Sequence, residues 1–233
     1  MRRRIAIGDV HGCSKTLQTL IEGGINPDKK DELYFVGDLI DRGPSTREVL
    51  DYLIKLKSKG FNIFAVRGNH EDIFLKAYED ESFVKAWFSN GAEETLKSFD
   101  PPEIIPKNQE CLRIIPDKYL RFIMEMPLYY DLIDSIIVHA GLNFDSDDIL
   151  MDENAMLWSR QMNYHAGKIN NKIIIHGHTP IPISIIKIMV SDPECKILNI
   201  DAGCVYKNRN GLGILAALDI DKRELITQEN IDW

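Results

Sequence analysis

Short apolar runs alternate with amphipathic stretches over the first 75 residues of the chain. The segments "RIAIGD", "ELYFVGD" and "FNIFAVRGN" are rich in β-branched and aromatic residues and end at glycine, which is typical of buried strands. Two stretches between them have a helical pattern, Ser14 to Glu22 and "STREVLDYLIKLKSKG". The second is expected to begin at Ser45 as N-cap and to end at Gly60. This alternation predicts βαβ units and a parallel sheet.

The middle of the chain, from about residue 71 to 126, has a different pattern. The stretches "FVKAWFSN", "AEETLKSF" and "DKYLRFIMEM" are helical in their spacing of apolar residues, and "DPPEIIP" interrupts them. We expect a helical insertion that covers one edge of the functional site. A single domain over residues 1–233 accommodates it.

From Pro127 onward the strand pattern returns. The segments are short, β-branched and bounded by turns: "PLYYDL", "SIIVHAG", "KIIIHGH", "ISIIKIMV", "KILNIDAG", "GILAALDI" and "ELIT". They predict antiparallel additions and a second sheet. The expected class is therefore α/β.

Composition narrows the range of functions. With 233 residues and 44% apolar residues, the chain can form one sizeable core, and no apolar run approaches the roughly 20 residues of a membrane span. The apolar part of the start "MRRRIAIGDV" is too short for a signal peptide, so we expect a cytoplasmic protein with no membrane partner. The net charge of −8 argues against a nucleic-acid partner. The four cysteines have no CxxC spacing, so neither a zinc knuckle nor a disulfide framework is expected.

Polar clusters lie at five expected strand ends. They are "GDVHG", "GDLIDRG", "GNHE", "HAG" and "HGHT", and of the six histidines only His165 lies outside them. Burying so many acids and imidazoles together costs several kcal/mol unless cations compensate. Oxygen and nitrogen donors without thiolate suit a pair of divalent ions such as manganese, iron or zinc. Asp9 and His11 would face the same side of an extended segment, and Asp38 could bridge two ions that lie about 3.5–4 Å apart.

In this order, the five motifs resemble the phosphoprotein phosphatase family of metallophosphoesterases, and most of all its compact bacterial and phage serine/threonine protein phosphatases. The motifs run from Gly8 to Thr179. The resemblance implies a calcineurin-like sandwich of two mixed β-sheets flanked by helices. It also implies a metal-dependent phosphomonoester hydrolase in which a hydroxide bound to two metal ions, most simply Mn²⁺, attacks phosphorus in line. The implied partner is a phosphorylated protein or peptide, and we expect a monomer.

The resemblance also assigns roles to individual residues. It implies one metal held by Asp9, His11 and Asp38, and a second held by Asp38, Asn69, His139 and one histidine of "HGHT". His70 would be the general acid, oriented by Asp41. The phosphate-binding residues implied are Arg42, Arg160 of "LWSR", and Asn69.

Either of the two histidines of "HGHT" could be the metal ligand. His176 and His178 are two positions apart, so extended geometry would let both face one way. The family's ligand follows the glycine, which selects His178. Glycine also lets the chain bend away from the strand, so the residue beyond the strand end is better placed. We expect His176 to lie beside the site as a hydrogen-bonded neighbour.

Three other functions fit parts of the pattern. A sister branch that shares most of the motifs hydrolyses dinucleoside polyphosphates such as diadenosine tetraphosphate. Hydrolases of nucleotides or small phosphodiesters usually carry Gly-His-x-His, whereas Pro180 stands at that second position here. A non-catalytic binding module would be expected to have lost ligands, and all are present.

Overall fold

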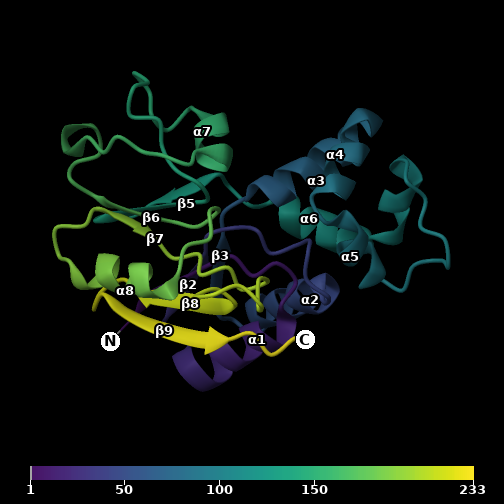
Figure 1. Cartoon of the computed structure of the whole chain (residues 1–233), viewed down its shortest axis with the longest axis horizontal. Helices are drawn as coiled ribbons and strands as arrows, with labels where there is room; N and C mark the ends of the chain where they lie inside the picture. Colours follow the sequence, from purple (N-terminus) through teal and green to yellow (C-terminus); the bar gives the residue numbers. More distant parts are fainter. Residues whose placement is uncertain (1) are drawn as a thin grey trace.

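Two β-sheets organise the chain in the computed structural model, which describes residues 2–233 (Figure 1). The first has five strands in the order β3-β2-β1-β8-β9. Its strands are β1 (Arg4–Ile7), β2 (Glu32–Phe35), β3 (Asn62–Ala65), β8 (Ile214–Asp219) and β9 (Glu224–Glu229). β1, β2 and β3 are mutually parallel, as the alternating pattern predicted, whereas β8 and β9 add antiparallel to them.

The second sheet has four strands in the order β4-β5-β6-β7. They are β4 (Tyr129–Asp131), β5 (Ser135–Val138), β6 (Ile173–His176) and β7 (Ile197–Asn199). Only β4 pairs antiparallel here, and β5, β6 and β7 are parallel. The expectation of antiparallel additions after Pro127 is thus wrong for three of the strands. Both sheets are mixed, and the predicted α/β class is confirmed.

The segment "ISIIKIMV" is a helix, α8 (Ile183–Ser191), and its prediction as a strand is wrong. Isoleucine density favoured a strand, but β6 and β7 are parallel neighbours, and a parallel connection needs a crossover segment. The burial follows the helical period, since Ile186 and Val190 are buried while Ile188 is exposed.

Two helices follow the first strands. α1 (Ser14–Thr19) continues as a π-helical turn over Leu20–Ile25, and α2 spans Thr46–Ser58. Ser45 stands at the N-cap position of α2, as expected, but its side chain makes no capping hydrogen bond.

The helical middle region begins at Asn69 because the "GNHE" motif forms the first turn of α3 (Asn69–Glu79). It continues through α4 (Val84–Ser89), α5 (Ala92–Lys97) and α6 (Asp117–Met124), with 3₁₀ turns at Glu81–Phe83 and Gln109–Ile114. These helices lie together on one side of the sheets (Figure 1). Beyond them, α7 spans Glu153–Trp158 and a 3₁₀ turn spans Ala166–Lys168.

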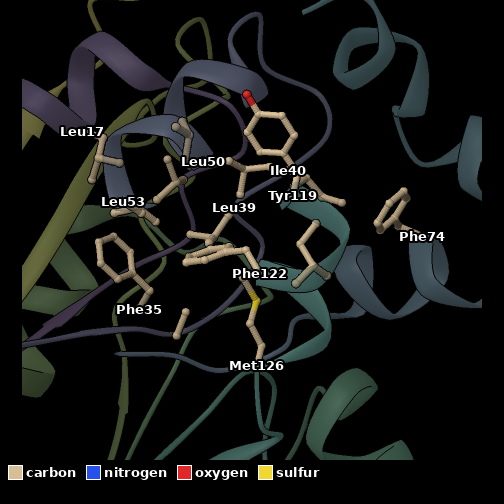
Figure 2. Close-up of a cluster of buried hydrophobic side chains, with 14 of the residues drawn as sticks. Leu17, Phe35, Leu39, Ile40, Leu50, Leu53, Phe74, Tyr119, Phe122 and Met126 are labelled. Atoms are coloured by element: carbon tan, nitrogen blue, oxygen red, sulfur yellow. The ribbon is translucent and has the colours of Figure 1, made fainter. Parts of the chain in front are cut away.

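One apolar cluster joins the first sheet to the helical region. Phe35 and Leu39 at the end of β2, Leu53 of α2 and Phe122 of α6 pack together in it (Figure 2). A second cluster lies between the sheets, with Val36 on one side and Ile137 and Ile175 on the other. Because the central strands are buried on both faces, their sequences are continuous apolar runs.

Across residues 2–233, no helix combines the length and the apolar character needed to cross a membrane. The four cysteines are free thiols.

Candidate metal centre and active site

The carboxyl ends of the strands from both sheets meet at one place. Parallel strands bring the residues that follow them to one edge of a sheet, where ligands bind in open α/β folds. Two groups of potential ligands form there, His11–Asp38–His70 and Asp38–His139–His178, and the donor atoms within each group lie within 4.8 Å of one another. Asp38 belongs to both groups.

The second group converges on one point. His139 Nε2 and His178 Nδ1 each lie 2.9 Å from Asn69 Oδ1, and the two ring nitrogens are 3.2 Å apart. His139 donates its other ring proton, on Nδ1, to the carbonyl of Val36 at 2.8 Å. Burial lowers the pKa of His139, and burial together with His139 lowers the pKa of His178 to about 3. Neutral imidazoles whose lone pairs face an amide oxygen form a set of donors that suits a cation.

The first group is built around His11. Its Nδ1 donates to the carbonyl of Ile40 at 2.9 Å, which turns Nε2 toward Asp38 Oδ2 at 3.5 Å and toward the guanidinium of Arg42 at 2.9 Å. Burial lowers the pKa of His11, so its Nε2 carries a lone pair. A guanidinium cation beside that lone pair marks a spot where positive charge is favoured.

Asp9 lies beside the first group but outside the clusters of atoms within 4.8 Å. Its Oδ2 accepts the backbone N–H of His178 at 3.0 Å, and its Oδ1 is buried with no hydrogen-bond partner among residues 2–233. Burial and the nearby Asp201 and Asp38 raise its pKa. A buried carboxylate oxygen without a partner, crowded by other acids, is what a cation would stabilise. The residues therefore fit the divalent ions that the sequence predicts.

His70 and Asp41 form a buried pair. His70 Nδ1 donates to Asp41 Oδ2 at 2.8 Å, and both side chains are inaccessible to solvent. Burial alone would lower the pKa of His70, but Asp38 and Asp41 raise it further than burial lowers it. His70 also counts among the donors of the first group, although its Nδ1 is occupied by Asp41. The arrangement suits an acid more than a ligand.

The glycines of the motifs make room for the ligands. A Cβ on Gly177 would lie 1.9 Å from Asp9 Oδ1, and one on Gly68 would lie 2.1 Å from Asp38 Oδ1. No side chain fits at either position. This explains physically why glycine precedes His178 and Asn69 in the motifs.

Five of the predicted site residues have left-handed backbone conformations, which non-glycine residues rarely adopt. They are His11 (φ 44°), Asp38 (φ 50°), Asp41 (φ 67°), Arg42 (φ 68°) and His178 (φ 73°). Such conformations persist only where the surroundings impose them. Glu71 does so for Asp38: its carboxylate accepts the N–H groups of Gly68, Asp38, Leu39 and Ile40 at 2.7–3.2 Å.

Arg42 and Arg160 lie on different sides of the groups. Arg42 is half-buried against His11, whereas Arg160 is exposed just after α7 and lies close enough to lower the pKa of His178 as a lesser contributor after burial. Next to Arg160, the exposed Trp158 meets His178 edge-on with ring centres 6.1 Å apart. Trp158 also lines a cavity of about 260 Å³ that includes the amide side chains of Asn154, Gln161 and Asn163. A larger cavity of about 740 Å³, at the far end of α3, contains none of the predicted site residues.

His176 lies apart from both groups of donors. Its Nδ1 lies 3.1 Å from the carbonyl of Gly177, and burial lowers its pKa to about 4. The structure thus places His178, and not His176, in the cluster.

Three further residues contact the site without having been predicted. Asp201 follows β7, is buried close to Asp9, and has its pKa raised to about 7 by burial. Trp87 and Thr95 hydrogen-bond to Asp41 from the helical region. The "NIDAG" segment has the same strand-to-acid pattern as the other motifs and could have indicated Asp201.

Comparison with known proteins shows which family has a similar sequence. A family profile described as "Calcineurin-like phosphoesterase" matches residues 2–210. A bis(5′-nucleosyl)-tetraphosphatase PrpE [asymmetrical] of Anoxybacillus flavithermus is 27% identical and is aligned over 95% of this chain and 91% of its own length.

Two solved structures have a similar fold. One, described as a putative diadenosine tetraphosphatase, has a TM-score of 0.63 at 19% identity and covers 98% of this chain and 94% of its own. A protein serine/threonine phosphatase from Saccharomyces cerevisiae, described as similar to human phosphatase PP5, has a TM-score of 0.60 at 15% identity. The match covers 99% of this chain and 80% of that protein's chain.

Proposed function

The chain belongs to the calcineurin-like phosphoesterases, and from this premise we propose that it hydrolyses phosphoserine and phosphothreonine in protein or peptide substrates with the help of two divalent metal ions. The observation that carries the proposal is the buried His70–Asp41 pair beside Asp38. An acid held in this way matters most when the leaving group is a poor one, as the alkoxide of serine is.

Two sets of side chains would hold the ions. Asp9, His11 and Asp38 would bind the first, and Asp38, Asn69, His139 and His178 the second. Manganese suits these oxygen and nitrogen donors, and iron or zinc would also fit. Bound there, divalent ions would neutralise charge on the phosphoryl oxygens and lower the pKa of water to supply a nucleophile near neutral pH.

Arg42 and Arg160 would bind the phosphate. A guanidinium presents two parallel donors that match two oxygens of a phosphate dianion. Arg42 approaches from the side of His11, and Arg160 approaches from the side of His178. The amide of Asn69 lies between the two histidines of the second group and would contact both metal and phosphate.

His70 would protonate the leaving oxygen. Asp41 fixes the ring through Nδ1, and Nε2 is buried 4.0 Å from Asp38 Oδ2 with no hydrogen-bond partner among the described residues. Nε2 is therefore the atom that would donate a proton to the serine or threonine oxygen as its bond to phosphorus breaks. Asp38 and Asp41 raise the pKa of His70 against the effect of burial, which favours the protonated form of its ring.

A second candidate is the asymmetrical hydrolysis of dinucleoside polyphosphates. The relative of 27% identity carries that name. The partly exposed Trp158 and the cavity that it lines, whose walls carry both amides and the acids Asp145 and Asp152, also suit a planar base that carries hydrogen-bonding groups. A nucleoside polyphosphate is a better leaving group than an alkoxide, so this reaction would depend less on His70.

A substrate panel with manganese tests both candidates. We expect turnover of phosphoserine and phosphothreonine peptides that EDTA abolishes and added manganese restores. Turnover of diadenosine tetraphosphate alone would replace the first candidate by the second. Activity on none of these substrates, in a protein that binds metal, would overturn both.

Trp158→Ala separates the candidates within one protein. If a base stacks on Trp158, KM for the dinucleotide should rise about 5- to 150-fold, since base–aromatic stacking contributes about 1–3 kcal/mol. KM for a phosphoserine peptide should change little. Trp233 is exposed and does not line this cavity, so Trp233→Ala serves as the tryptophan control.

A further inference from the structure

The loop after β2 carries an acid and an arginine in an unfavourable backbone conformation. Asp41 and Arg42 are consecutive, and both have left-handed φ values, 67° and 68°. Such conformations persist only where contacts from elsewhere hold the residues in place. Glu71 binds the N–H groups of residues 38–40 and does not reach residues 41 and 42.

Asp41 is held from the helical region. The indole N–H of Trp87 donates to both carboxylate oxygens at 3.1 Å. The hydroxyl of Thr95 donates to Oδ1 at 2.7 Å, and the same hydroxyl oxygen accepts the backbone N–H of Asp41 at 2.9 Å. Trp87 and Thr95 are almost wholly buried, so these bonds do not compete with water.

Arg42 is held from the same region. Its backbone N–H donates to the carbonyl of Gly91 at 3.3 Å. Gly91 has a φ of 107°, and a Cβ there would lie 2.8 Å from the Arg42 backbone nitrogen. Only glycine allows this approach.

The three contacts come from one stretch of chain at regular spacing. Trp87 lies in α4, Gly91 stands at the turn, and Thr95 lies in α5, each four residues after the one before. The turn at Gly91 separates two helices, so the common direction follows from the contacts and not from a helical period. Trp87, Gly91 and Thr95 all hydrogen-bond to residues 41 and 42.

We propose that Trp87, Gly91 and Thr95 form a helical clamp that positions Asp41 to orient His70 and positions Arg42 toward the substrate phosphate. The proposal rests on the proposed function, in which His70 is the acid. The clamp residues are positioning residues, because they reach the reacting atoms only through Asp41, His70 and Arg42. The helical region would then serve the reaction as well as the fold.

Removing single hydrogen bonds tests the clamp. Trp87→Phe retains an aromatic ring without the N–H, and Thr95→Val retains shape without the hydroxyl. Each should lower kcat for a phosphoserine peptide on the order of a hundredfold, as small misplacements of catalytic groups do. The loss should be smaller for p-nitrophenyl phosphate, whose leaving group needs little protonation, and bound manganese should be unchanged. Thr95→Ser should restore most of the activity.

A double-mutant comparison isolates the route of the effect. If Trp87 acts through His70, then Trp87→Phe should cause almost no further loss of kcat in a His70→Asn background. Leu96→Val is the matched control, because Leu96 is buried next to Thr95 in α5 and makes no hydrogen bond to Asp41. Leu96→Val should lower the melting temperature without changing the ratio of the kcat values for the phosphoserine peptide and p-nitrophenyl phosphate.

A measurement without substrate tests the clamp separately from the proposed function. In the metal-free protein, the Nδ1 proton of His70 should give a strongly downfield NMR signal because it is shared with a buried carboxylate, and His70→Asn should remove it. We expect this signal to broaden or vanish in Trp87→Phe and Thr95→Val and to persist in Thr95→Ser and Leu96→Val. An unchanged signal in Trp87→Phe and Thr95→Val, or equal kinetic losses on both substrates, would overturn the clamp. Inactivity of the wild-type protein on phosphoserine peptides would instead overturn the proposed function alone.

Discussion

At the scale of single residues, His176 and His178 show how two identical side chains acquire different roles. A left-handed backbone at His178 turns its ring toward His139 and Asn69, whereas His176 remains within β6. Gly177 separates the two histidines, and it carries no side chain because a Cβ there would lie 1.9 Å from Asp9 Oδ1. The spacing does not distinguish the two histidines, whereas the left-handed backbone at His178 does.

Metal content should distinguish the two histidines. We expect His178→Ala to lose one bound ion and most of the activity, because it removes a nitrogen from the second group. His176→Ala should keep both ions and lose at most about tenfold to a hundredfold, as changes beyond the direct ligands do. Metal analysis of the two purified variants shows which of the two histidines binds the ion. The reverse pattern would make His176 the ligand.

His70→Asn should affect the leaving group and not the metals. The change removes an acid, so kcat for a phosphoserine substrate should fall on the order of 10²–10⁴-fold. The fall should be smaller for p-nitrophenyl phosphate, and both ions should remain bound. Equal losses on both substrates would rule out the role of His70 as an acid.

At the scale of elements, α8 shows where a local pattern misleads. Its isoleucines favour a strand by composition, and only the parallel pairing of β6 with β7 requires a crossover there. Long-range pairing of this kind is not encoded in a window of eight residues. The strands that end in motifs were easier to predict, because their polar residues mark where each strand stops.

Substitutions on α8 test the helix directly. Ile186 and Ile188 would share one face of a strand, but Ile186 is buried in the helix whereas Ile188 is 69% exposed. Ile186→Ser should therefore lower the free energy of unfolding by about 3 kcal/mol. Ile188→Ser should change it by less than about 0.5 kcal/mol. Urea denaturation of the two variants measures both values, and similar losses would indicate a strand.

The helical region shows a second limit at this scale. Its helices were predictable from apolar spacing, but Trp87 and Thr95 lie about 50 residues from Asp41 in the sequence. Nothing local to a buried aromatic residue and a threonine indicates that they bind an acid. The predicted residues of the candidate site were accessible because they form dense polar motifs, and the supporting residues are dispersed.

At the scale of the whole molecule, the two sheets contribute different residues to one candidate site. β1 and β2 lead to Asp9, His11 and Asp38, whereas β5 and β6 lead to His139 and His178. Two buried acids of the site, Asp9 and Asp201, have their pKa values raised by burial. Asp201, in particular, has its pKa raised from 3.8 to about 7 by burial, with Gly203 acting in the opposite sense.

Asp201 should make the metal-free protein less stable as the pH rises. An acid whose pKa is higher in the folded state binds more protons there, so the contribution of Asp201 to the free energy of unfolding falls between about pH 4 and pH 7. The lowered pKa values of His176 and His178 act in the opposite sense below about pH 6.5. Asp201→Asn should therefore shift the change in melting temperature between pH 5.5 and pH 7.5 in the positive direction, whereas the exposed Asp147→Asn should leave it as in the wild type. An identical change in the wild type and in Asp201→Asn would contradict the expectation.

The left-handed conformations at His11, Asp38, Asp41, Arg42 and His178 have an evolutionary consequence. Glycine would relieve the strain at each position, but it would remove a side chain that the proposed reaction needs. Selection for heat resistance alone would therefore enrich glycine in these loops and yield robust, inactive proteins. A library screened only by melting temperature should drift toward such variants, and one screened by turnover should retain the strained residues.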